Sequence, residues 1–293
     1  MAARWFEQGA KFVTPVKDTY PFISDFNLGS FHGKSALVTG SSRGIGLQTA
    51  IHLAKAGCSK IALAARSSLS DAKELVEKAA ADAKTDIKIL TLDLDVSSVE
   101  SVEAAVTEVK KAFGNLDLLV NNAAFLSKHS LIGESDPSVY WKTWETNING
   151  TYLCTRAFLP LLLESTLKTV INMSSSGGHV VFPGASAYQT TKFAVCRFTE
   201  FLDAEYAEKG LIAIALNPGA VKTKLSSVLP SSLEKYLEDT VELSADTVVW
   251  ISKERRNWLA GRFVTATWNM EELEKRKEEI SEKDLLKFKM DFA

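Results

Sequence analysis

The chain has 293 residues, of which 46% are hydrophobic and 24% charged, and its formal net charge is −2. This is the balance of an ordinary globular protein, and it excludes the strongly basic footprint of a protein that binds nucleic acid or an anionic membrane. No stretch approaches roughly eighteen uncharged apolar residues and the start lacks the apolar core of a signal peptide, so we predict neither a membrane span nor a secretory leader.

The three cysteines are an odd number and lack metal-ligand spacing. We therefore predict no metal site and a reduced, cytoplasmic setting. Cys154 and Cys196 are interpreted as small core residues.

Residues 1–33 differ from the rest of the chain because they show no sustained hydrophobic period. We interpret them as an N-terminal extension that wraps the surface of the following domain. The sequence is compatible with an ordered and with a disordered extension. Its aromatic residues favour some packing, namely Trp5, Phe6, Phe12 and Phe22.

From Ser35 onwards, short apolar runs alternate with stretches that repeat at the helical period. The runs are too short for helices and predict strands, whereas the stripe from Val99 to Phe113 predicts a helix that Gly114 ends. Alternating strands and helices are typical of βαβ units and a parallel sheet. We expect an α/β fold, one Rossmann-type doubly wound domain over residues 34–293, whose seven-stranded, mostly parallel sheet has helices on both faces. The expected strands are 35–39, 61–65, 87–92, 116–120, 169–173, 211–216 and 262–266.

The end of the chain, from about residue 271 to 289, is dense in Glu and Lys, with apolar residues interspersed. This composition favours a solvated amphipathic helix as a C-terminal tail. A dedicated binding element is the alternative interpretation.

The first expected strand runs into a glycine-rich turn and then a helix. Glycines allow the backbone to approach a pyrophosphate closely, and the helix N-terminus supplies free N–H groups and a partial positive charge. A strand, such a turn and a helix in this order predict a dinucleotide site. The spacing G-x-x-x-G-x-G resembles that of the short-chain dehydrogenase/reductase family. The predicted cofactor contacts in this turn are Gly40, Ser42, Arg43, Gly44, Ile45 and Gly46.

The second expected strand ends at Ala64-Ala65-Arg66, without the carboxylate that an NAD site usually places on the ribose 2′-hydroxyl. Arg43 and Arg66 together supply two guanidinium groups, which suit a 2′-phosphate. We therefore predict NADP(H) rather than NAD(H) as the cofactor. The alternative is that either arginine only faces solvent.

The resemblance implies further cofactor contacts after the third, fourth and sixth strands. An aspartate after the third strand would contact the adenine, and Asp93 competes with Asp95 for this role. The run Asn121-Asn122-Ala123-Ala124 looks like the family's Asn-Asn-Ala-Gly, with Ala124 in place of glycine. Val221 and Thr223 would touch the nicotinamide end. The implied contacts are Asp95, Val96, Asn122, Ala123, Pro218, Gly219, Val221 and Thr223.

Tyr188 is the only tyrosine followed four residues later by a lysine, Lys192. Positions i and i+4 share a helix face, so the ammonium, with a cationic nicotinamide in the oxidised complex, can lower the pKa of the phenol from its free value of about 10. An acid/base that works near neutral pH would result. Ser175, which follows the fifth strand, could hold the substrate oxygen, with Ser174 as the competing choice.

The resemblance adds a catalytic asparagine, Asn147, which would position a water against the lysine; Asn149 is the fallback. It also implies that Tyr188 and Lys192 contact the cofactor. The matching motifs extend from about residue 33 to 270, and the sequence is similar to fungal members often associated with secondary metabolism. A homodimer or homotetramer is implied, with Trp141 and Trp144 packed in the core or at a subunit interface.

These residues predict an oxidoreductase that transfers a hydride between NADP(H) and a ketone or secondary alcohol. Apolar residues in the segment from about 221 to 241 suggest a bulky, fairly hydrophobic small molecule as the substrate and a mobile lid. One alternative is a non-redox isomerase, dehydratase or cyclase that keeps NADP(H) as a scaffold. Another is a non-catalytic sensor, which has no need of Tyr188 or Ser175. His129 and His179 could face the substrate, whereas His32 and His52 are interpreted as structural.

Overall fold

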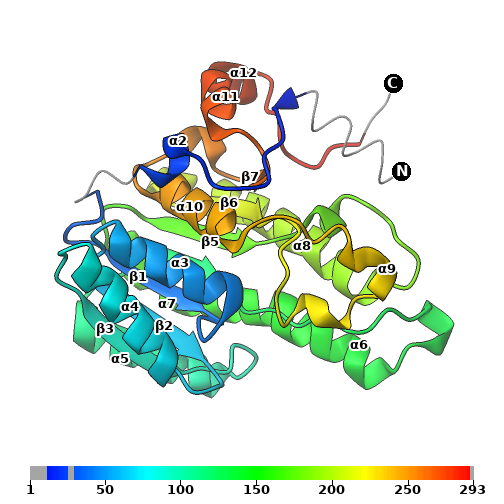
Figure 1. The fold of residues 1–293 in the computed structure, drawn as a ribbon, viewed down its shortest axis with the longest axis horizontal. Helices are drawn as coiled ribbons and strands as arrows, with labels where there is room; N and C mark the ends of the chain where they lie inside the picture. Colours follow the sequence, from blue (N-terminus) through cyan, green and yellow to red (C-terminus); the bar gives the residue numbers. More distant parts are fainter. Residues whose placement is uncertain (1–11, 26–29, 291–293) are drawn as a thin grey trace.

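The computed structural model describes residues 12–25 and 30–290 (Figure 1). Its seven strands form one sheet in the order β3-β2-β1-β4-β5-β6-β7, and every neighbouring pair is parallel. The predicted α/β fold is therefore confirmed, with a fully parallel sheet where a mostly parallel one was expected. The strands are β1 (Ser35–Thr39), β2 (Lys60–Ala65), β3 (Lys88–Asp93), β4 (Leu118–Asn121), β5 (Thr169–Met173), β6 (Ile212–Asn217) and β7 (Arg262–Thr265).

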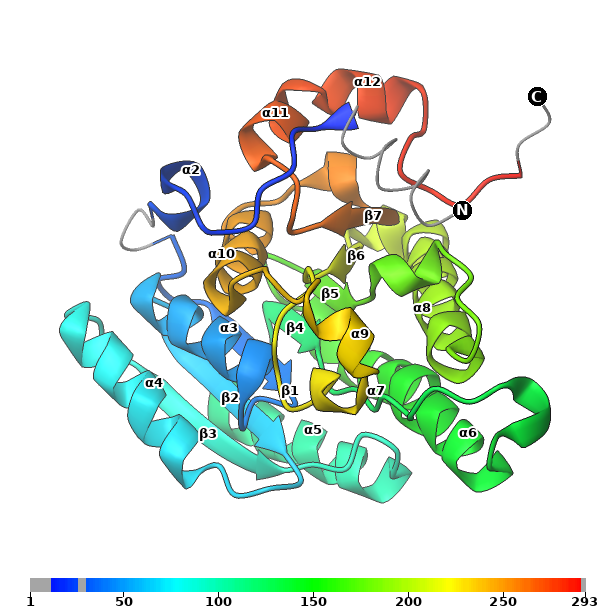
Figure 2. The same cartoon turned by 45° about the vertical axis from the view of Figure 1, so that its right-hand side comes forward.

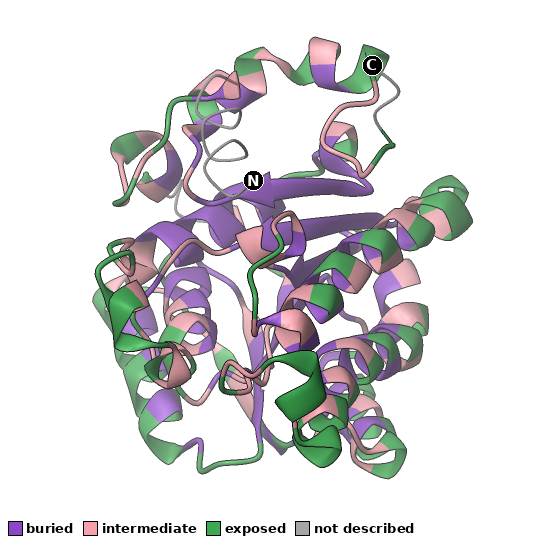
Figure 3. Ribbon diagram, turned by 90° about the vertical axis from the view of Figure 1, so that its right-hand side faces the viewer, coloured by how far each residue is buried: buried purple, intermediate pink, exposed green. Residues whose placement is uncertain are grey.

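All strands except the edge strand β3 are buried on both faces, and Figure 3 shows strands in the colour of buried residues. Successive residues of a strand point to opposite faces. In β1, Ala36 and Val38 therefore belong to one hydrophobic core and Leu37 to the other. Because both faces need apolar side chains, the strands appear as continuous apolar runs.

Six long helices cover the two faces (Figures 1 and 2). The first core takes residues from α3 (Gly44–Lys55), α4 (Ser70–Asp82) and α10 (Val241–Ser252). The second core takes residues from α5 (Val99–Phe113), α7 (Gly150–Leu163) and α8 (Ser186–Tyr206).

The strand order reverses between β1 and β4, which are neighbours although two strands separate them along the chain. After β1 the chain builds outward to β2 and β3, and it then returns to β4 on the other side. In open parallel sheets, ligands bind in the crevice that such a reversal leaves at the carboxyl ends of the strands. The fold thus brings the segments after β1 and β4 together.

The remaining elements are short. None of the helices in the described ranges is long and apolar enough to cross a bilayer. The short helices are α2 (Pro21–Ser24), α6 (Pro137–Trp144), α9 (Ser231–Glu234), α11 (Met270–Lys275) and α12 (Lys277–Glu282), together with the π-helix η2 (Glu145–Asn149) and the 3-10 helices η1 (Ile132–Glu134), η3 (Ser176–Gly178), η4 (Ala207–Lys209), η5 (Ser226–Val228) and η6 (Asn257–Leu259).

The described part of the N-terminal extension packs against the C-terminal third of the chain (Figure 2). Val13 and Ile23 are buried. The ring of Phe12 lies 5.9 Å from that of Trp268, and the ring of Phe22 lies 6.2 Å from that of Trp250. Trp5 and Phe6 lie outside the described residues.

The single amphipathic helix expected over residues 271–289 is wrong, because the structure has two short helices and then an irregular segment. The chain leaves helical geometry at Arg276, whose guanidinium donates to the carbonyl of Phe12 over 2.5 Å and lies 3.6 Å from its ring centroid. Beyond α12, Asp284 and Leu286 adopt positive φ angles of 49° and 64°. Contact with the extension thus ends a helix that the local sequence would continue.

All three cysteines are free and buried. The interpretation of Cys154 and Cys196 as core residues is therefore confirmed.

Candidate active site

A cavity of about 570 Å³ opens at the carboxyl ends of β1 to β4, where the strand order reverses. Its lining combines the glycine turn after β1 with segments after β2, β3, β4 and β6. Twelve of the residues that the sequence predicted for cofactor binding line it: Gly40, Ser42, Arg43, Gly44, Ile45, Gly46, Arg66, Asp95, Val96, Asn122, Ala123 and Thr223. Pro218, Gly219, Val221, Tyr188 and Lys192 are not part of this lining.

The glycine turn packs closely against the segment after β4 at Gly40 and Gly46. A Cβ on Gly46 would lie 2.5 Å from Nδ2 of Asn122 and 2.6 Å from the carbonyl oxygen of Gly40. Asn122 in turn donates to the carbonyl of Thr39 over 2.8 Å. The turn after β1 is therefore held directly on the segment after β4.

The N-terminus of α3 faces this turn without a side-chain cap, since the preceding residue, Arg43, makes no capping hydrogen bond. The first N–H groups of a helix have no partner within the helix and suit an anion. Glycines that no side chain could replace and uncapped N–H groups together fit the diphosphate of a dinucleotide.

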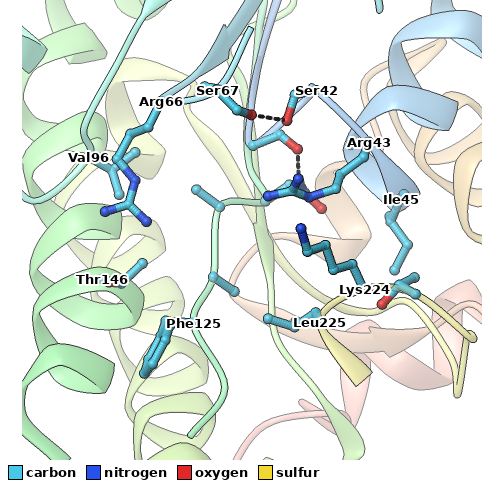
Figure 4. Close-up of a pocket in the computed structure, with 18 of the residues that line it drawn as sticks. Ser42, Arg43, Ile45, Arg66, Ser67, Val96, Phe125, Thr146, Lys224 and Leu225 are labelled. Atoms are coloured by element: carbon cyan, nitrogen blue, oxygen red, sulfur yellow. Dashed lines mark hydrogen bonds between the residues drawn. The ribbon is translucent and has the colours of Figure 1, made fainter. Parts of the chain in front are cut away.

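The cavity lining holds three cations, Arg43, Arg66 and Lys224, but only one carboxylate, Asp95 (Figure 4). Arg66 Nη1 lies 3.5 Å from Oδ2 of Asp95. Within the part of the chain that the structure describes, Arg43 and Lys224 form no ion pair, and the Lys224 ammonium points toward the Arg43 guanidinium in Figure 4. Like charges that converge without an acid between them suit an anionic ligand.

Asp95 remains ionised beside these cations. Burial raises its pKa, but hydrogen bonds from Ser97 and the charge of Arg66 outweigh burial, so the net pKa is lowered. The rival, Asp93, is exposed and does not line this cavity; it lines a second hollow next to it, beside Arg66.

The proposed catalytic side chains meet at the carboxyl end of β5. Ser175 follows that strand, and its hydroxyl lowers the pKa of the Tyr188 phenol on α8. The Lys192 ammonium, one turn further along α8, lies 5.5 Å from the centroid of the Tyr188 ring. It donates to the carbonyl of Met173 over 2.7 Å. A hydroxyl, a phenol and an ammonium are thus close together, as general acid/base chemistry requires.

Burial dominates the pKa values of this group. It raises the pKa of Tyr188 to about 12, against the lowering effect of the hydrogen bond from Ser175. It lowers the pKa of Lys192 to about 8. The charge of Lys192 by itself therefore does not lower the pKa of Tyr188, because the cost of burying a phenolate exceeds the help from its protein neighbours. A protonated phenol follows at neutral pH.

The two candidate serines differ in their surroundings. Ser174 is 2% exposed, and its hydroxyl donates to the carbonyl of Lys192 over 2.9 Å. Ser175 is half-buried and its hydroxyl accepts from the N–H of Gly177 over 3.0 Å. The hydroxyl of Ser174 is thus taken up by packing under α8, whereas that of Ser175 faces Tyr188.

The two candidate asparagines lie in the π-helix η2, a type of distortion that frequently occurs at functional sites. Asn147 is buried and Asn149 is exposed. The Asn147 amide accepts from the N–H of Phe125 over 2.8 Å and donates to its carbonyl over 3.0 Å. It also donates to the Thr191 hydroxyl over 3.0 Å. Asn147 therefore links the segment after β4 to α8.

His52 and His179 contact residues outside this group. His52 is buried and forms a hydrogen bond with the carboxylate of Asp246, in agreement with its interpretation as structural. His179 packs its ring 4.0 Å from that of Phe263 and 4.6 Å from that of Phe288, and burial lowers its pKa to about 4. No three His, Cys, Asp or Glu side chains group as metal ligands within residues 12–25 and 30–290.

Several residues of the cavity escaped the sequence analysis, because only the fold brings their loops together. Lys224 is the most consequential of these, and its position next to Thr223 was the one available signal. The others are Ala65, Ser67, Leu94, Phe125, Leu126 and Thr146. Ala124 belongs to the expected Asn-Asn-Ala-Ala run, and Leu225 and Val228 belong to the apolar segment expected to contact the substrate.

Comparisons with known proteins identify relatives over most of the chain. Residues 34–233 match the family model of the short chain dehydrogenases. Short chain dehydrogenase mpl6 of Monascus purpureus is 49% identical over 274 residues, which cover 93% of this chain and 94% of that protein. Short chain dehydrogenase pigC of Monascus ruber is 41% identical over 277 residues, with coverages of 93% and 91%. A solved structure, the NADPH-bound carbonyl reductase from chicken fatty liver, matches with a TM-score of 0.69 and 25% identity, over 80% of this chain and 97% of that one. As its motifs predicted, the chain belongs to the short-chain dehydrogenase/reductase family of oxidoreductases.

Proposed function

We propose that the protein uses NADP(H) to interconvert a ketone and a secondary alcohol on a bulky, apolar small molecule. The observation that carries this proposal is the position of the Lys192 ammonium, 5.5 Å from the centroid of the Tyr188 ring, beside Ser175 at the carboxyl end of β5. This group could bind a carbonyl oxygen and deliver a proton to it.

In this proposal the cofactor supplies or accepts the hydride. Tyr188 donates its proton to the carbonyl oxygen, a step favoured near neutral pH because burial keeps the phenol protonated. Ser175 donates a hydrogen bond to the same oxygen. Lys192 stabilises the negative charge that develops on the phenol. Asn147 keeps the segment after β4 and α8 in register through its bonds to Phe125 and Thr191.

Charge in the cavity supports NADP(H) over NAD(H). Arg43 and Arg66 would hold the 2′-phosphate, and Lys224 adds a third cation near them. The chicken carbonyl reductase with the same fold is NADPH-bound. The turn from Gly40 to Gly46 would hold the diphosphate. We propose that Asp95 and Val96 contact the adenine and that Tyr188 and Lys192 contact the ribose. The residues proposed to contact the nicotinamide side are Asn122, Ala123, Pro218, Gly219, Val221 and Thr223.

Apolar loops support a bulky substrate. Leu225 and Val228, on the loop after β6, line the cavity. Phe182, on the loop after β5, and Tyr236 are 44% and 60% exposed. Exposed apolar residues on loops that follow the carboxyl ends of the strands are typical of a ligand-binding surface.

We also propose a cytoplasmic homo-oligomer with a role in fungal secondary metabolism. Large aromatic side chains are exposed on α6, α7 and α8, which supports packing of a second subunit on this face. They are Trp141, Tyr152, Phe193 and Phe201. Size-exclusion chromatography with light scattering tests the oligomer, and a monomer at micromolar concentration would contradict it.

The hydride transfer is tested with NADPH deuterated at the nicotinamide C4. The purified protein is incubated with each of the two C4 epimers and a panel of hydrophobic aliphatic, cyclic and aromatic ketones, and mass spectrometry detects products that gain deuterium. Tyr188→Phe should lower the rate by about 10² to 10⁴ and leave NADPH affinity nearly unchanged. If NADPH binds but neither epimer labels any product, the non-redox alternative gains weight.

Cofactor choice is tested by titration. Arg43→Ala should weaken NADPH binding by about 10-fold to 100-fold, the value of a hydrogen bond between charged groups, and leave NADH binding unchanged. Lys222→Ala is the matched control, because Lys222 is exposed and does not line the cavity. Equal losses for NADPH and NADH would contradict recognition of the 2′-phosphate.

A further inference from the structure

The loop between β6 and α10 is tied together where it leaves and re-enters the domain. The N–H of Ala220 donates to Oδ2 of Asp239 over 2.6 Å, and the N–H of Asp239 donates to the carbonyl of Ala220 over 3.2 Å. Val221 and Asp239 form an isolated parallel bridge. We call residues Ala220, Val221 and Asp239 the neck of the loop. Figure 2 shows the loop in yellow, with α9.

The cavity-lining residues of this loop all lie beyond the neck. They are Thr223, Lys224, Leu225 and Val228. No strand or long helix holds this part of the loop, whose elements are the short helices η5 and α9. The contacts of the neck with the domain therefore largely fix the position of Lys224 over the cavity.

Asp239 packs tightly against the turn that precedes the neck. A Cβ on Gly219 would lie 2.8 Å from Oδ2 of Asp239, and Gly219 has a φ angle of 93°. Burial raises the pKa of Asp239, against the lowering effect of the hydrogen bond from Ala220. This half-buried carboxylate bonds to the backbone of Ala220 and is thereby placed to hold the turn containing Pro218 and Gly219.

The N-terminal extension contacts the two residues that flank Asp239 in the sequence. The N–H of Thr240 donates to the carbonyl of Lys17 over 3.0 Å, and its hydroxyl donates to Oδ1 of Asp18 over 2.8 Å. Lys17 also forms an ion pair with Glu238. Three contacts thus join consecutive residues of the extension to the residues on both sides of Asp239.

The same part of the extension is also bonded to the core of the domain. Thr19, the next residue of the extension, bonds to the carboxylate of Asp246 on α10. Asp246 is buried and pairs with His52 on α3, the helix that starts at the glycine turn. The extension is therefore fixed to two core helices immediately beside the point where it holds Thr240.

We propose that Asp239 is a positioning residue for cofactor binding and that Lys17 and Asp18 complete the same clamp. The clamp keeps the loop of residues 222–238 closed over the cavity, so that Thr223 and Lys224 meet the cofactor. A protein whose binding-competent state is only partly populated binds its ligand more weakly in proportion. The affinity part of this proposal rests on the NADP(H) function proposed above, whereas the clamp itself does not.

Limited proteolysis with trypsin reads loop opening directly, in protein without nucleotide, because Lys222, Lys224 and Lys235 are cleavable sites in the loop. Asp239→Ala should speed cleavage there by about 10-fold or more, since it removes a hydrogen bond from a charged group. Asp239→Asn should restore most of the protection, because its carboxamide oxygen can still accept from Ala220.

The extension is tested with a variant that does not endanger folding. Asp18 is exposed, and Asp18→Ala should speed cleavage of the loop by about 2-fold to 5-fold, the value of one hydrogen bond at the surface. Asp25→Ala is the matched control, an exposed acid of the same extension outside these contacts, and should cleave like the unmodified protein.

NADPH titration by nucleotide fluorescence completes the test. Asp239→Ala should weaken NADPH binding by about the same factor by which it speeds cleavage, with Asp239→Asn close to the unmodified protein. Unchanged cleavage in folded Asp239→Ala and Asp18→Ala would overturn the clamp. Faster cleavage with unchanged NADPH affinity would overturn the positioning role. If the unmodified protein does not bind NADPH, the proposed function fails, and proteolysis alone still decides the clamp.

Discussion

Replacing the buried Lys192 by methionine should abolish activity and stabilise the fold. Lys192 is 3% exposed, and burial lowers its pKa from 10.5 to about 8. One pKa unit corresponds to about 1.4 kcal/mol, so the buried charge costs the folded state about 3 kcal/mol near neutral pH. The hydrogen bond to the carbonyl of Met173 offsets about 1 kcal/mol of this cost. Because methionine fills a similar space without charge, we expect Lys192→Met to raise the free energy of unfolding by about 2 kcal/mol.

The pH dependence of this gain follows from the direction of the pKa shift. Between pH 8 and 10.5 the folded protein has released the Lys192 proton while the unfolded chain still holds it. The unfolded state then binds more protons, so the stability of the unmodified protein increases with pH relative to the variant. The difference in the free energy of unfolding between Lys192→Met and the unmodified protein, called the stability gap below, should therefore narrow by about 2 kcal/mol between roughly pH 7 and pH 10.

Urea unfolding followed by tryptophan fluorescence, at both pH values and without nucleotide, measures the gap. Lys111→Met is the control, because Lys111 is exposed on α5 and its substitution should leave stability nearly unchanged at either pH. A Lys192→Met variant that is less stable near neutral pH, or a gap that does not change with pH, would refute the assignment of a costly buried charge.

Three further predictions concern the cavity and the catalytic group. Gly46→Ala places a Cβ within 2.6 Å of the carbonyl oxygen of Gly40. The affinity for NADPH should therefore fall at least about 10-fold, and the melting temperature should also fall. An unchanged affinity would contradict the close packing of the glycine turn. Ser175→Ala should lower kcat by about 10² to 10³ with little loss of stability. Ser174→Ala should cost about 1 kcal/mol of stability, because it removes a buried hydrogen bond to the carbonyl of Lys192, and it should retain most of kcat. The reverse pattern in kinetics and melting would exchange the roles of the two serines. Lys224→Ala should weaken NADPH binding about 10-fold and reduce its salt dependence, and an unchanged dissociation constant would remove Lys224 from the site.

Features that depend on residues near one another in the chain could be predicted from the sequence. Each expected strand agrees with an observed one to within two residues at either end, because a strand buried on both faces needs an uninterrupted apolar run. The glycine turn could be recognised because its function depends on the absence of side chains at fixed spacing. Tyr188 and Lys192 could be paired because a helix places positions i and i+4 on one face.

The tertiary structure alone decided what depends on residues far apart in the chain. Lys224 reaches the cavity, and Asp239 closes the neck of its loop, only because β6, α10 and the extension meet. The C-terminal helix is interrupted at Arg276 by contact with Phe12, which no local period could reveal. The pKa of Tyr188 is raised rather than lowered because desolvation is set by all the atoms that the fold packs around the phenol, not by the lysine one turn away.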